Sequence, residues 1–230
     1  MQAKAATPIV KPMKAYKTYI FDMDGTITDT LVVWLGVFRD NLLAFGVNAP
    51  DDKTLSQHTH DWKDMLKLGL PEEKLAAFTA MAHKLANERL PEAPFHIGAY
   101  EALETLKNHG KNIAIFSTMD RPMFEPAMQY RNLYAITKVA VAGTDVPERK
   151  PRPDGILKAL RDLGLSEADK KDAVYIGDKD SDILAAHNAD IDSILFYPAA
   201  HKLFYDLEKL KAHQPTHIIN DWSELIAPLT

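Results

Sequence analysis

The chain contains no cysteine in its 230 residues. This absence excludes a disulfide framework, thiol catalysis, and zinc or iron–sulfur sites built on cysteine ligands. A basic surplus is also missing, because the formal net charge is −5 at pH 7, which argues against nucleic acid as a partner. No apolar run approaches the ~20 residues that a membrane-spanning helix needs, and residues 1–15 lack the apolar stretch of a signal peptide. We therefore expect a cytoplasmic protein that binds neither nucleic acid nor membrane.

Short apolar runs alternate with amphipathic stretches along most of the chain, a pattern typical of a parallel sheet covered by helices. Several runs are apolar throughout, as expected for strands that are buried on both faces. The fold class predicted from this pattern is α/β, with a Rossmann-like doubly wound parallel sheet as its core. The expected strands are residues 18–21, 113–116, 139–142, 173–176, 193–196 and 217–219, and the expected helices are residues 98–109, 121–132, 154–163, 181–188, 202–211 and 221–228.

The alternation breaks between residues 31 and 93, where the sequence has helical patterning and no convincing strand. This stretch is far longer than the dozen or so residues that a crossover between parallel strands needs. We therefore expect an α-helical cap domain over residues 31–93, with Asp29 or Thr30 capping its first helix. The α/β core would comprise residues 16–30 and 94–230, and residues 1–15 would form an N-terminal extension. Because the chain passes between cap and core only twice, the cap is expected to close as a mobile lid.

The strongest chemical signal is the run FDMDGT, which continues the first expected strand. Asp22 and Asp24 are spaced i and i+2, which places both side chains on the same side of an extended chain. Gly25 then allows the backbone to turn sharply, and Thr26 follows it. A polar strand end with a capping turn is the simpler interpretation. The buried strand directly before the motif nevertheless favours a functional site.

A second acidic run, GDKDSD, follows the expected strand at residues 173–176. Asp178 lies at the end of that strand, and Asp182 lies one turn into the next helix. Asp180 and Ser181 could be no more than helix caps. Asp178 fits that interpretation less well, because a carboxylate at a buried strand end costs free energy unless it is paired or binds a cation.

Two further polar elements fall near the carboxyl ends of expected strands. Ser117 and Thr118 follow the strand at residues 113–116, where hydroxyls and backbone N–H groups can hold an anion. Lys150 precedes the helix expected at residues 154–163. Each residue alone is weak evidence. Together with the two acidic motifs they gather at the sheet edge where open α/β sheets bind ligands.

Such a set of side chains suits phosphoryl transfer. Asp22, Asp24 and Asp178 would repel one another unless a cation lay among them, and oxygen ligands without His or Cys select a hard ion such as Mg²⁺. A carboxylate nucleophile, a neighbouring acid–base carboxyl, a hydroxyl and a lysine are the groups that form and break an aspartyl-phosphate. The sequence therefore favours Mg²⁺-assisted chemistry on a phosphorylated substrate.

The order of these motifs resembles that of the haloacid dehalogenase superfamily, with FDMDGT first, then Ser117, Lys150 and GDKDSD. The resemblance covers most of the chain. It implies that Asp22 is the nucleophile and a Mg²⁺ ligand. Asp24 would be the general acid and base and would bind the ion through its backbone carbonyl, and Asp178 would be the third ligand.

The same resemblance implies roles for the remaining motif residues. Ser117 and Lys150 would bind the transferring phosphoryl group, and Asp182 would support Lys150 or a metal-bound water. The helical insertion is similar to the caps of phosphoglycolate-phosphatase-like and beta-phosphoglucomutase-like members. Lys179 stands where these relatives usually carry Ser or Thr, which leaves the substrate open.

Within the cap, His58, Thr59 and His60 lie between expected helices, where the relatives place a specificity loop. These three residues are candidates for substrate contact, and a solvated connection between helices explains them equally well. Trp34 and Trp62 are assigned to packing rather than to a ligand pocket.

We therefore expect a Mg²⁺-dependent phosphatase that hydrolyses a small phosphorylated metabolite, a phosphomonoester, through an aspartyl-phosphate intermediate. A phosphosugar mutase of the beta-phosphoglucomutase type shares all the core motifs and stays open as an alternative. A phosphoryl-accepting receiver protein also combines aspartates, a hydroxyl and a lysine on a doubly wound sheet. A receiver, however, is about half as long and has no helical insertion. The sequence predicts neither the exact substrate nor the oligomeric state.

Overall fold

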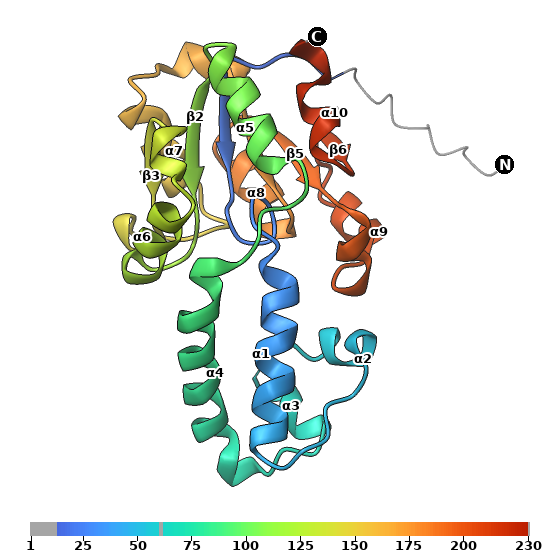
Figure 1. Cartoon of the computed structure of the whole chain (residues 1–230). Helices are drawn as coiled ribbons and strands as arrows, with labels where there is room; N and C mark the ends of the chain where they lie inside the picture. The colour runs from blue at the N-terminus through green and yellow to red at the C-terminus, as the bar shows by residue number, and fades with distance from the viewer. Residues whose placement is uncertain (1–12, 60–61, 230) are drawn as a thin grey trace, which may run out of the picture.

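The structure, a computed structural model, describes residues 13–59 and 62–229. Its centre is a sheet of six parallel strands in the order β3-β2-β1-β4-β5-β6 (Figure 1). The predicted doubly wound α/β fold is therefore confirmed, and each expected strand is present to within one residue at either end. The strands are β1 (Thr18–Phe21), β2 (Asn112–Phe116), β3 (Val139–Val141), β4 (Ala173–Gly177), β5 (Asp192–Phe196) and β6 (His217–Ile219).

Helices cover both faces of the sheet. Tyr19 and Phe21 of β1 point into one buried cluster, whereas Ile20 points into a cluster on the opposite face. All four residues of β1 are buried, which explains why this strand is apolar rather than alternating. The first cluster is closed by α5 (Ala99–Asn108), α6 (Arg121–Tyr130) and α10 (Trp222–Ile226), and the second by α7 (Asp154–Asp162) and α8 (Asp180–Asn188).

The strand order reverses at β1, which lies between β2 and β4. In the register of the sheet, Phe21 at the end of β1 pairs with Ile115 on one side and with Ile176 on the other. Ligands of open α/β sheets bind outside the carboxyl ends of the strands at such a reversal. The residues that follow β1 and β4 are therefore placed side by side where a site is expected.

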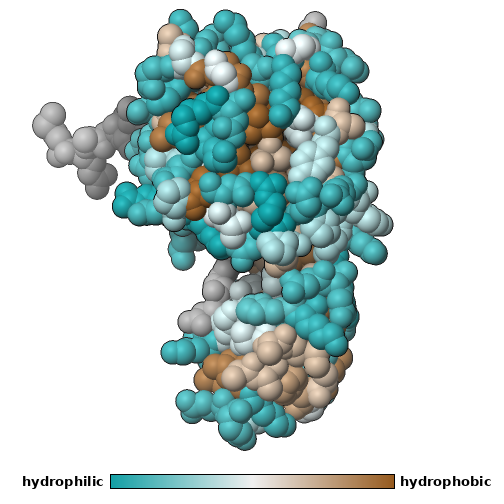
Figure 2. All heavy atoms as spheres, turned by 90° about the vertical axis from the view of Figure 1, so that its left-hand side faces the viewer, coloured by the Kyte–Doolittle hydropathy of each residue, from teal (hydrophilic) through white to brown (hydrophobic). Residues whose placement is uncertain are grey.

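Between β1 and β2 the chain forms a helical lobe beyond the carboxyl ends of the strands (Figure 1). The described residues of this lobe have their own apolar cluster, which includes Leu42 and Phe78. Figure 2 shows that the lobe meets the sheet body at a narrower waist. The cap boundaries at residues 31 and 93 stay predictions. The lobe contains α1 (Thr30–Ala44), α2 (Asp52–Ser56), α3 (Asp64–Lys67) and α4 (Leu75–Arg89).

The two segments that connect the lobe to the sheet body lie against each other. The N–H of Asp29 donates to the carbonyl of Pro94 at 2.8 Å, and the N–H of His96 donates to the carbonyl of Ile27 at 3.0 Å. The second connection is also fixed to the body, because the buried guanidinium of Arg131, directly after α6, donates to two of its carbonyls. The two connecting segments are thus hydrogen-bonded to each other, and the second is also anchored to the sheet body by Arg131.

Three local expectations need correction. Asp29 occupies the cap position of α1, but its side chain accepts no hydrogen bond there, and its backbone (φ −79°, ψ 69°) is not the extended conformation of a capping residue. The helix expected over residues 202–211 is broken into a 3₁₀ turn, Ala199–Leu203, and α9 (Leu207–Lys211). The break arises because Asp206 caps α9, accepting a hydrogen bond from the N–H of Glu208 at 3.0 Å. The last expected helix continues beyond α10 as the 3₁₀ turn Ala227–Leu229.

Across the described ranges, no helix is both long enough and apolar enough to cross a membrane.

Candidate active site

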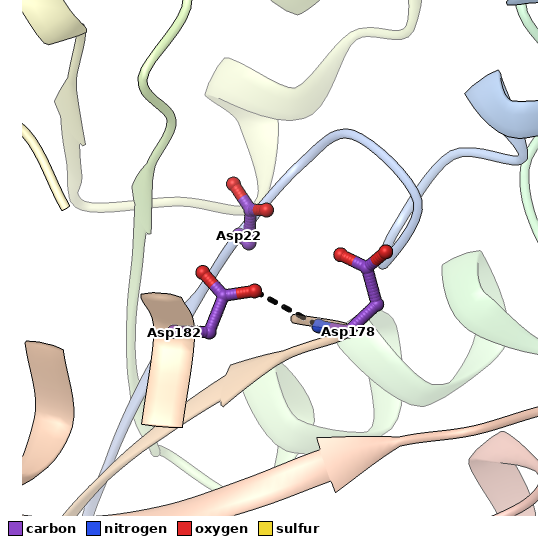
Figure 3. A group of neighbouring side chains, drawn as sticks. All are labelled: Asp22, Asp178 and Asp182. Carbon is purple, nitrogen blue, oxygen red and sulfur yellow. Dashed lines mark hydrogen bonds between the residues drawn. The ribbon is translucent and has the colours of Figure 1, made fainter. Parts of the chain in front are cut away.

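Three buried carboxylates meet beyond the ends of β1 and β4 (Figure 3). Asp22 directly follows β1, and its N–H donates to the carbonyl of Ile176 in β4 at 2.8 Å. Asp178 directly follows β4, and Asp182 lies in the first turn of α8. One carboxylate oxygen from each of the three lies within 4.8 Å of the other two. The fold therefore brings together acidic residues that lie far apart in the sequence.

Asp182 holds the loop between β4 and α8 in place. Its Oδ2 accepts hydrogen bonds from the N–H groups of Asp178 at 3.0 Å and Lys179 at 2.9 Å. Its Oδ1 accepts one from Nζ of Lys150 at 2.7 Å. Gly177 makes this approach possible, because a Cβ at that position would lie 2.3 Å from Cγ of Asp182. Since both of its oxygens are engaged, the contacts of Asp182 are those of an anchor for Lys150 rather than of a metal ligand.

Lys150 is the buried cation of this cluster. Its Nζ lies 2.9 Å from Oδ1 of Asp22 and 2.7 Å from Oδ1 of Asp182. Burial disfavours the charge, but these two carboxylates outweigh burial and raise the pKa of Lys150 well above its usual value. Nζ also donates to the hydroxyl of Tyr175 at 3.1 Å, which in turn donates to the carbonyl of Phe116 at 2.9 Å. The sequence analysis missed Tyr175, although a lone hydroxyl in an apolar strand was a signal for it.

The carboxylates are protonated more readily than usual because they are buried. Burial raises the pKa of Asp22 to about 8, the neighbouring carboxylates add to the effect, and Lys150 opposes it. Burial also raises the pKa of Asp178 to about 6, opposed first by Lys179. A cation among the carboxylates would favour their ionised forms.

The cluster fits a hard cation. Oδ2 of Asp178 is buried and has no hydrogen-bond partner among the described residues, whereas Oδ1 accepts from the hydroxyl of Thr26 at 3.3 Å. Gly25, with φ +78°, passes so close that a Cβ there would lie 2.5 Å from Oδ2. A buried carboxylate oxygen without a partner costs free energy unless a cation or donor reaches it. Asp22, Asp178 and Asp182 lie close enough together to hold a metal ion, and the unpartnered oxygen of Asp178 is the atom that such an ion would satisfy.

Asp24 lies on the more exposed side of the site, beside Ser117. The hydroxyl of Ser117 donates to Oδ2 of Asp24 at 3.3 Å, and Thr118 follows it half-buried at the same strand end. Burial raises the pKa of Asp24, and the charges of Lys179 and Lys150 oppose the rise. A carboxyl group with a raised pKa is suited to donate a proton to a leaving oxygen.

His96 contacts the turn after β1, and the sequence analysis did not single out this residue. Its Nε2 lies 3.1 Å from the carbonyl oxygen of Gly25. Burial lowers the pKa of His96, which favours the neutral ring, and a neutral ring with its proton on Nε2 would donate to that carbonyl. No local pattern could have predicted this contact, because the two residues are 71 positions apart in the chain.

A cavity of about 610 Å³ lies between the helical lobe and the sheet body, and Thr59 and Lys179 are among the residues that line it. His58 follows α2, is half-buried and is not among the lining residues. Its Nδ1 lies 2.8 Å from the carbonyl of Thr54 in α2. His60 lies outside the described residues. Of the two described candidates in the cap loop, the structure therefore places Thr59 at the cavity.

Known proteins share both the sequence pattern and the fold. Residues 19–196 match the haloacid dehalogenase-like hydrolase family. The pyrophosphatase PpaX of Bacillus mycoides (strain KBAB4) is 24% identical over 217 residues, which cover 93% of this chain and 96% of that protein. The structure of a candidate phosphatase from Clostridium difficile aligns with a TM-score of 0.78 at 20% identity, over 95% of this chain and 100% of the other.

A candidate beta-phosphoglucomutase from Thermotoga maritima aligns with a TM-score of 0.75 at 21% identity, over 91% of this chain and 96% of the other. These two structures share the fold of the sheet body and the helical lobe. The family match itself spans both acidic motifs and the lysine between them. The chain belongs to the haloacid dehalogenase-like hydrolases.

Proposed function

We propose that the protein is a Mg²⁺-dependent phosphatase that hydrolyses a small phosphomonoester through an aspartyl-phosphate. The observation that carries this proposal is the environment of Asp22, a buried carboxylate with Nζ of Lys150 at 2.9 Å and the unpartnered oxygen of Asp178 nearby. Membership in a family of hydrolases supports transfer to water. A small phosphorylated metabolite as partner and a cytoplasmic location, both expected from the sequence, belong to the same proposal.

In the first step, a carboxylate oxygen of Asp22 would attack phosphorus, and the bond between phosphorus and the leaving oxygen would break. Asp24 would donate its proton to the leaving oxygen, so that the products are an alcohol and phosphorylated Asp22. Lys150 and the hydroxyl of Ser117 would hold the phosphoryl oxygens. Asp22, Asp178 and the backbone carbonyl of Asp24 would hold a Mg²⁺, which would supply positive charge that reduces repulsion between the nucleophile and those oxygens.

In the second step, Asp24, now ionised, would take a proton from a water molecule. The water oxygen would attack phosphorus, and the bond between phosphorus and Asp22 would break, releasing inorganic phosphate. The Ser117 hydroxyl, 3.3 Å from Asp24, can keep that carboxylate oriented in both steps.

The helical lobe would serve as a lid over this site. Residues from the lobe and from the sheet body line one cavity, and the two connections between them lie side by side. Closure of such a lid excludes water during the first step. The cap loop would then bring Thr59 to the substrate, and His58 and His60 stay candidates for the same role.

A phosphosugar mutase is the alternative that shares this machinery, and it would pass the phosphoryl group from Asp22 to a sugar hydroxyl instead of water. The fold shared with the Thermotoga maritima protein is compatible with it. A receiver fits less well, because receivers have no helical lobe between the first two strands.

The test is phosphate release from a panel of phosphate esters, hexose phosphates and pyrophosphate, with Mg²⁺ and with a chelator. We expect release that needs Mg²⁺, and an Asp22→Asn protein that keeps its far-ultraviolet circular dichroism but has no turnover. Isomerisation of a hexose phosphate without phosphate release would favour the mutase. Release by folded Asp22→Asn protein near the wild-type rate would contradict the proposal.

A further inference from the structure

Aromatic side chains from both parts of the molecule line the cavity between the helical lobe and the sheet body, together with charged and aliphatic ones. Trp34 and Phe38 come from α1, Trp62 comes from the segment before α3, and Phe204 and Tyr205 come from the break before α9. The cavity of about 610 Å³ falls in the range of ~300–1,000 Å³ that is usual for small-molecule sites. A phosphate ester with a short aliphatic leaving group would leave much of this space to water.

Three rings form much of the lobe side of the cavity, and two of them, Trp34 and Trp62, keep part of their surface exposed. The centroids of Trp34 and Trp62 are 6.4 Å apart at an interplanar angle of 66°, and Phe38 lies 5.3 Å from Trp62. Trp34 and Trp62 are only half-buried by the chain itself, whereas Trp222 in the sheet body is 1% exposed. Rings in such an arrangement attract another flat ring beyond the gain from buried area alone. Trp34 and Trp62 pack against the core of the lobe, as predicted, and each also lines the cavity.

The opposite side of the cavity leads to the catalytic carboxylates. Lys179 lines the cavity and directly follows Asp178, and its positive charge opposes the rise in pKa that burial causes in both Asp178 and Asp24. Tyr205 also lines the cavity and lies close to Asp178. Burial raises the pKa of the Tyr205 hydroxyl, and the negative charge of Asp178 raises it further. The cavity thus has Lys179 next to the reaction site, with Asp180 and Asp206 also in its lining, and it has aromatic rings from both the lobe and the sheet body.

We propose that the substrate is a phosphomonoester of an alcohol that carries a flat aromatic ring. The ring lies between Trp34 and Trp62 of the lobe and Phe204 of the sheet body, with the phosphoryl group at Asp22. This inference rests on the phosphatase function proposed above, in which the bond from phosphorus to the ring-bearing oxygen breaks and Asp24 protonates that oxygen. An arylmethyl alcohol and a nucleoside both present such a ring, and the test separates them.

The first measurement compares kcat/KM of the wild-type protein with Mg²⁺ for benzyl phosphate, cyclohexylmethyl phosphate, ethyl phosphate and a purine nucleoside 5′-monophosphate. All four leaving groups are primary alcohols, so differences report how the remainder of the substrate is bound. We expect benzyl phosphate or the nucleotide to exceed cyclohexylmethyl phosphate by at least about tenfold, or ~1.4 kcal/mol in barrier. The better of the two identifies the source of the ring. Equal values for the aromatic and cyclohexyl compounds would overturn the inference.

The second measurement asks whether the preference comes from this cavity. Trp34→Leu should reduce the ratio of kcat/KM between benzyl and cyclohexylmethyl phosphate to within about twofold, and Trp34→Phe should restore most of it. Phe45→Leu is the matched control, because Phe45 packs on Phe78 at a centroid distance of 5.7 Å in the same lobe but does not line the cavity. The control should keep the wild-type ratio. If it lost the ratio as completely as Trp34→Leu, the preference would reflect lobe packing and the placement of the ring would be wrong.

The third measurement does not depend on turnover. Calorimetry would compare binding of 2-phenylethylphosphonate and 2-cyclohexylethylphosphonate to the wild-type protein with Mg²⁺, since the carbon–phosphorus bond is not hydrolysed. We expect the phenyl compound to bind at least about tenfold more tightly. Tighter phenyl binding without turnover of any ester would support the aromatic site and contradict the phosphatase. Turnover of the esters without a ring preference in either assay would support the phosphatase and overturn this inference.

Discussion

A single methyl group at Gly177, the last residue of β4, should disrupt the whole carboxylate cluster. Gly177 is not among the residues with positive φ, so its backbone alone would accept alanine. The obstacle is Asp182, because a Cβ at position 177 would lie 2.3 Å from its Cγ and 2.4 Å from its Oδ2. Carbon atoms do not approach this closely without a bond, so Gly177→Ala must displace the Asp182 side chain.

The displacement would remove the contacts that Asp182 makes with two backbone N–H groups and with Lys150. The side chains of the Lys150–Asp182 pair are only 4% and 2% exposed, and breaking a buried ion pair costs ~3–5 kcal/mol. An added methylene in a packed interior costs ~1–3 kcal/mol by itself. With partial relaxation, we expect the free energy of unfolding to fall by about 3–5 kcal/mol. Because Lys150 would no longer be held at Asp22, kcat/KM should fall by at least about 100-fold.

Urea denaturation and kcat/KM for a generic phosphate ester would measure both effects. Gly36→Ala in α1 is the matched control, because its new Cβ would meet only Nη1 of Arg89, at 3.8 Å. Alanine in place of glycine inside a helix should stabilise the protein by ~0.5–1 kcal/mol. A Gly177→Ala protein with full activity and an unfolding free energy within about 0.5 kcal/mol of wild type would refute the role given to Asp182.

Three further predictions concern Asp24, Arg131 and His201. Asp24→Asn should reduce kcat by ~10²–10⁴-fold for alkyl phosphates and by less for aryl phosphates, whose leaving groups need little protonation. Equal losses of kcat for both kinds of ester would argue against Asp24 as the general acid. Arg131→Met should lower the free energy of unfolding in urea by about 2–4 kcal/mol, because the carbonyls of Ala93 and Leu90 lose their buried donor. An unchanged midpoint of urea unfolding would show that Arg131 does not stabilise the connection between lobe and sheet body. Burial lowers the pKa of His201 from 6.5 to about 3, so only the unfolded chain binds this proton between those values. The free energy of unfolding should fall by up to ~1.4 kcal/mol for each pH unit of decrease in that range. His201→Phe should make this dependence on pH shallower. An identical dependence in the variant would show that other groups cause it.

The strands and the motifs at their ends could be predicted from the sequence because both depend on local patterns. The run TYIF is buried along its whole length, so its apolar character reports the burial of β1 directly. Asp22 and Asp178 then follow neighbouring strands, and the pairing of β1 with β4 brings them together. Because the strands are parallel, motifs that follow different strands in the sequence lie together at one edge of the sheet.

The remaining features could not be predicted, since they depend on contacts between distant segments. Residues 202–211 have a helical pattern, but the cap made by Asp206 starts a new helix and leaves Phe204 and Tyr205 at the cavity. Nothing near Tyr205 in the sequence indicates that it faces Asp178. The aromatic cavity likewise needs the lobe and the sheet body together, so neither Trp34 nor its segment alone could reveal it.

The most direct test of the account is to identify the residue that becomes phosphorylated during turnover. The Asp24→Asn variant with an aryl phosphate and Mg²⁺ is the best system, because the first step needs little acid catalysis while the second step lacks its base. Rapid acid quenching, proteolysis and mass spectrometry would locate the phosphoryl group. We expect one phosphoryl group on Asp22, formed together with a burst of the aryl alcohol and absent when Asp22 is also replaced by Asn. A burst with the phosphoryl group on another residue, or rapid turnover with none on Asp22, would contradict the central claim.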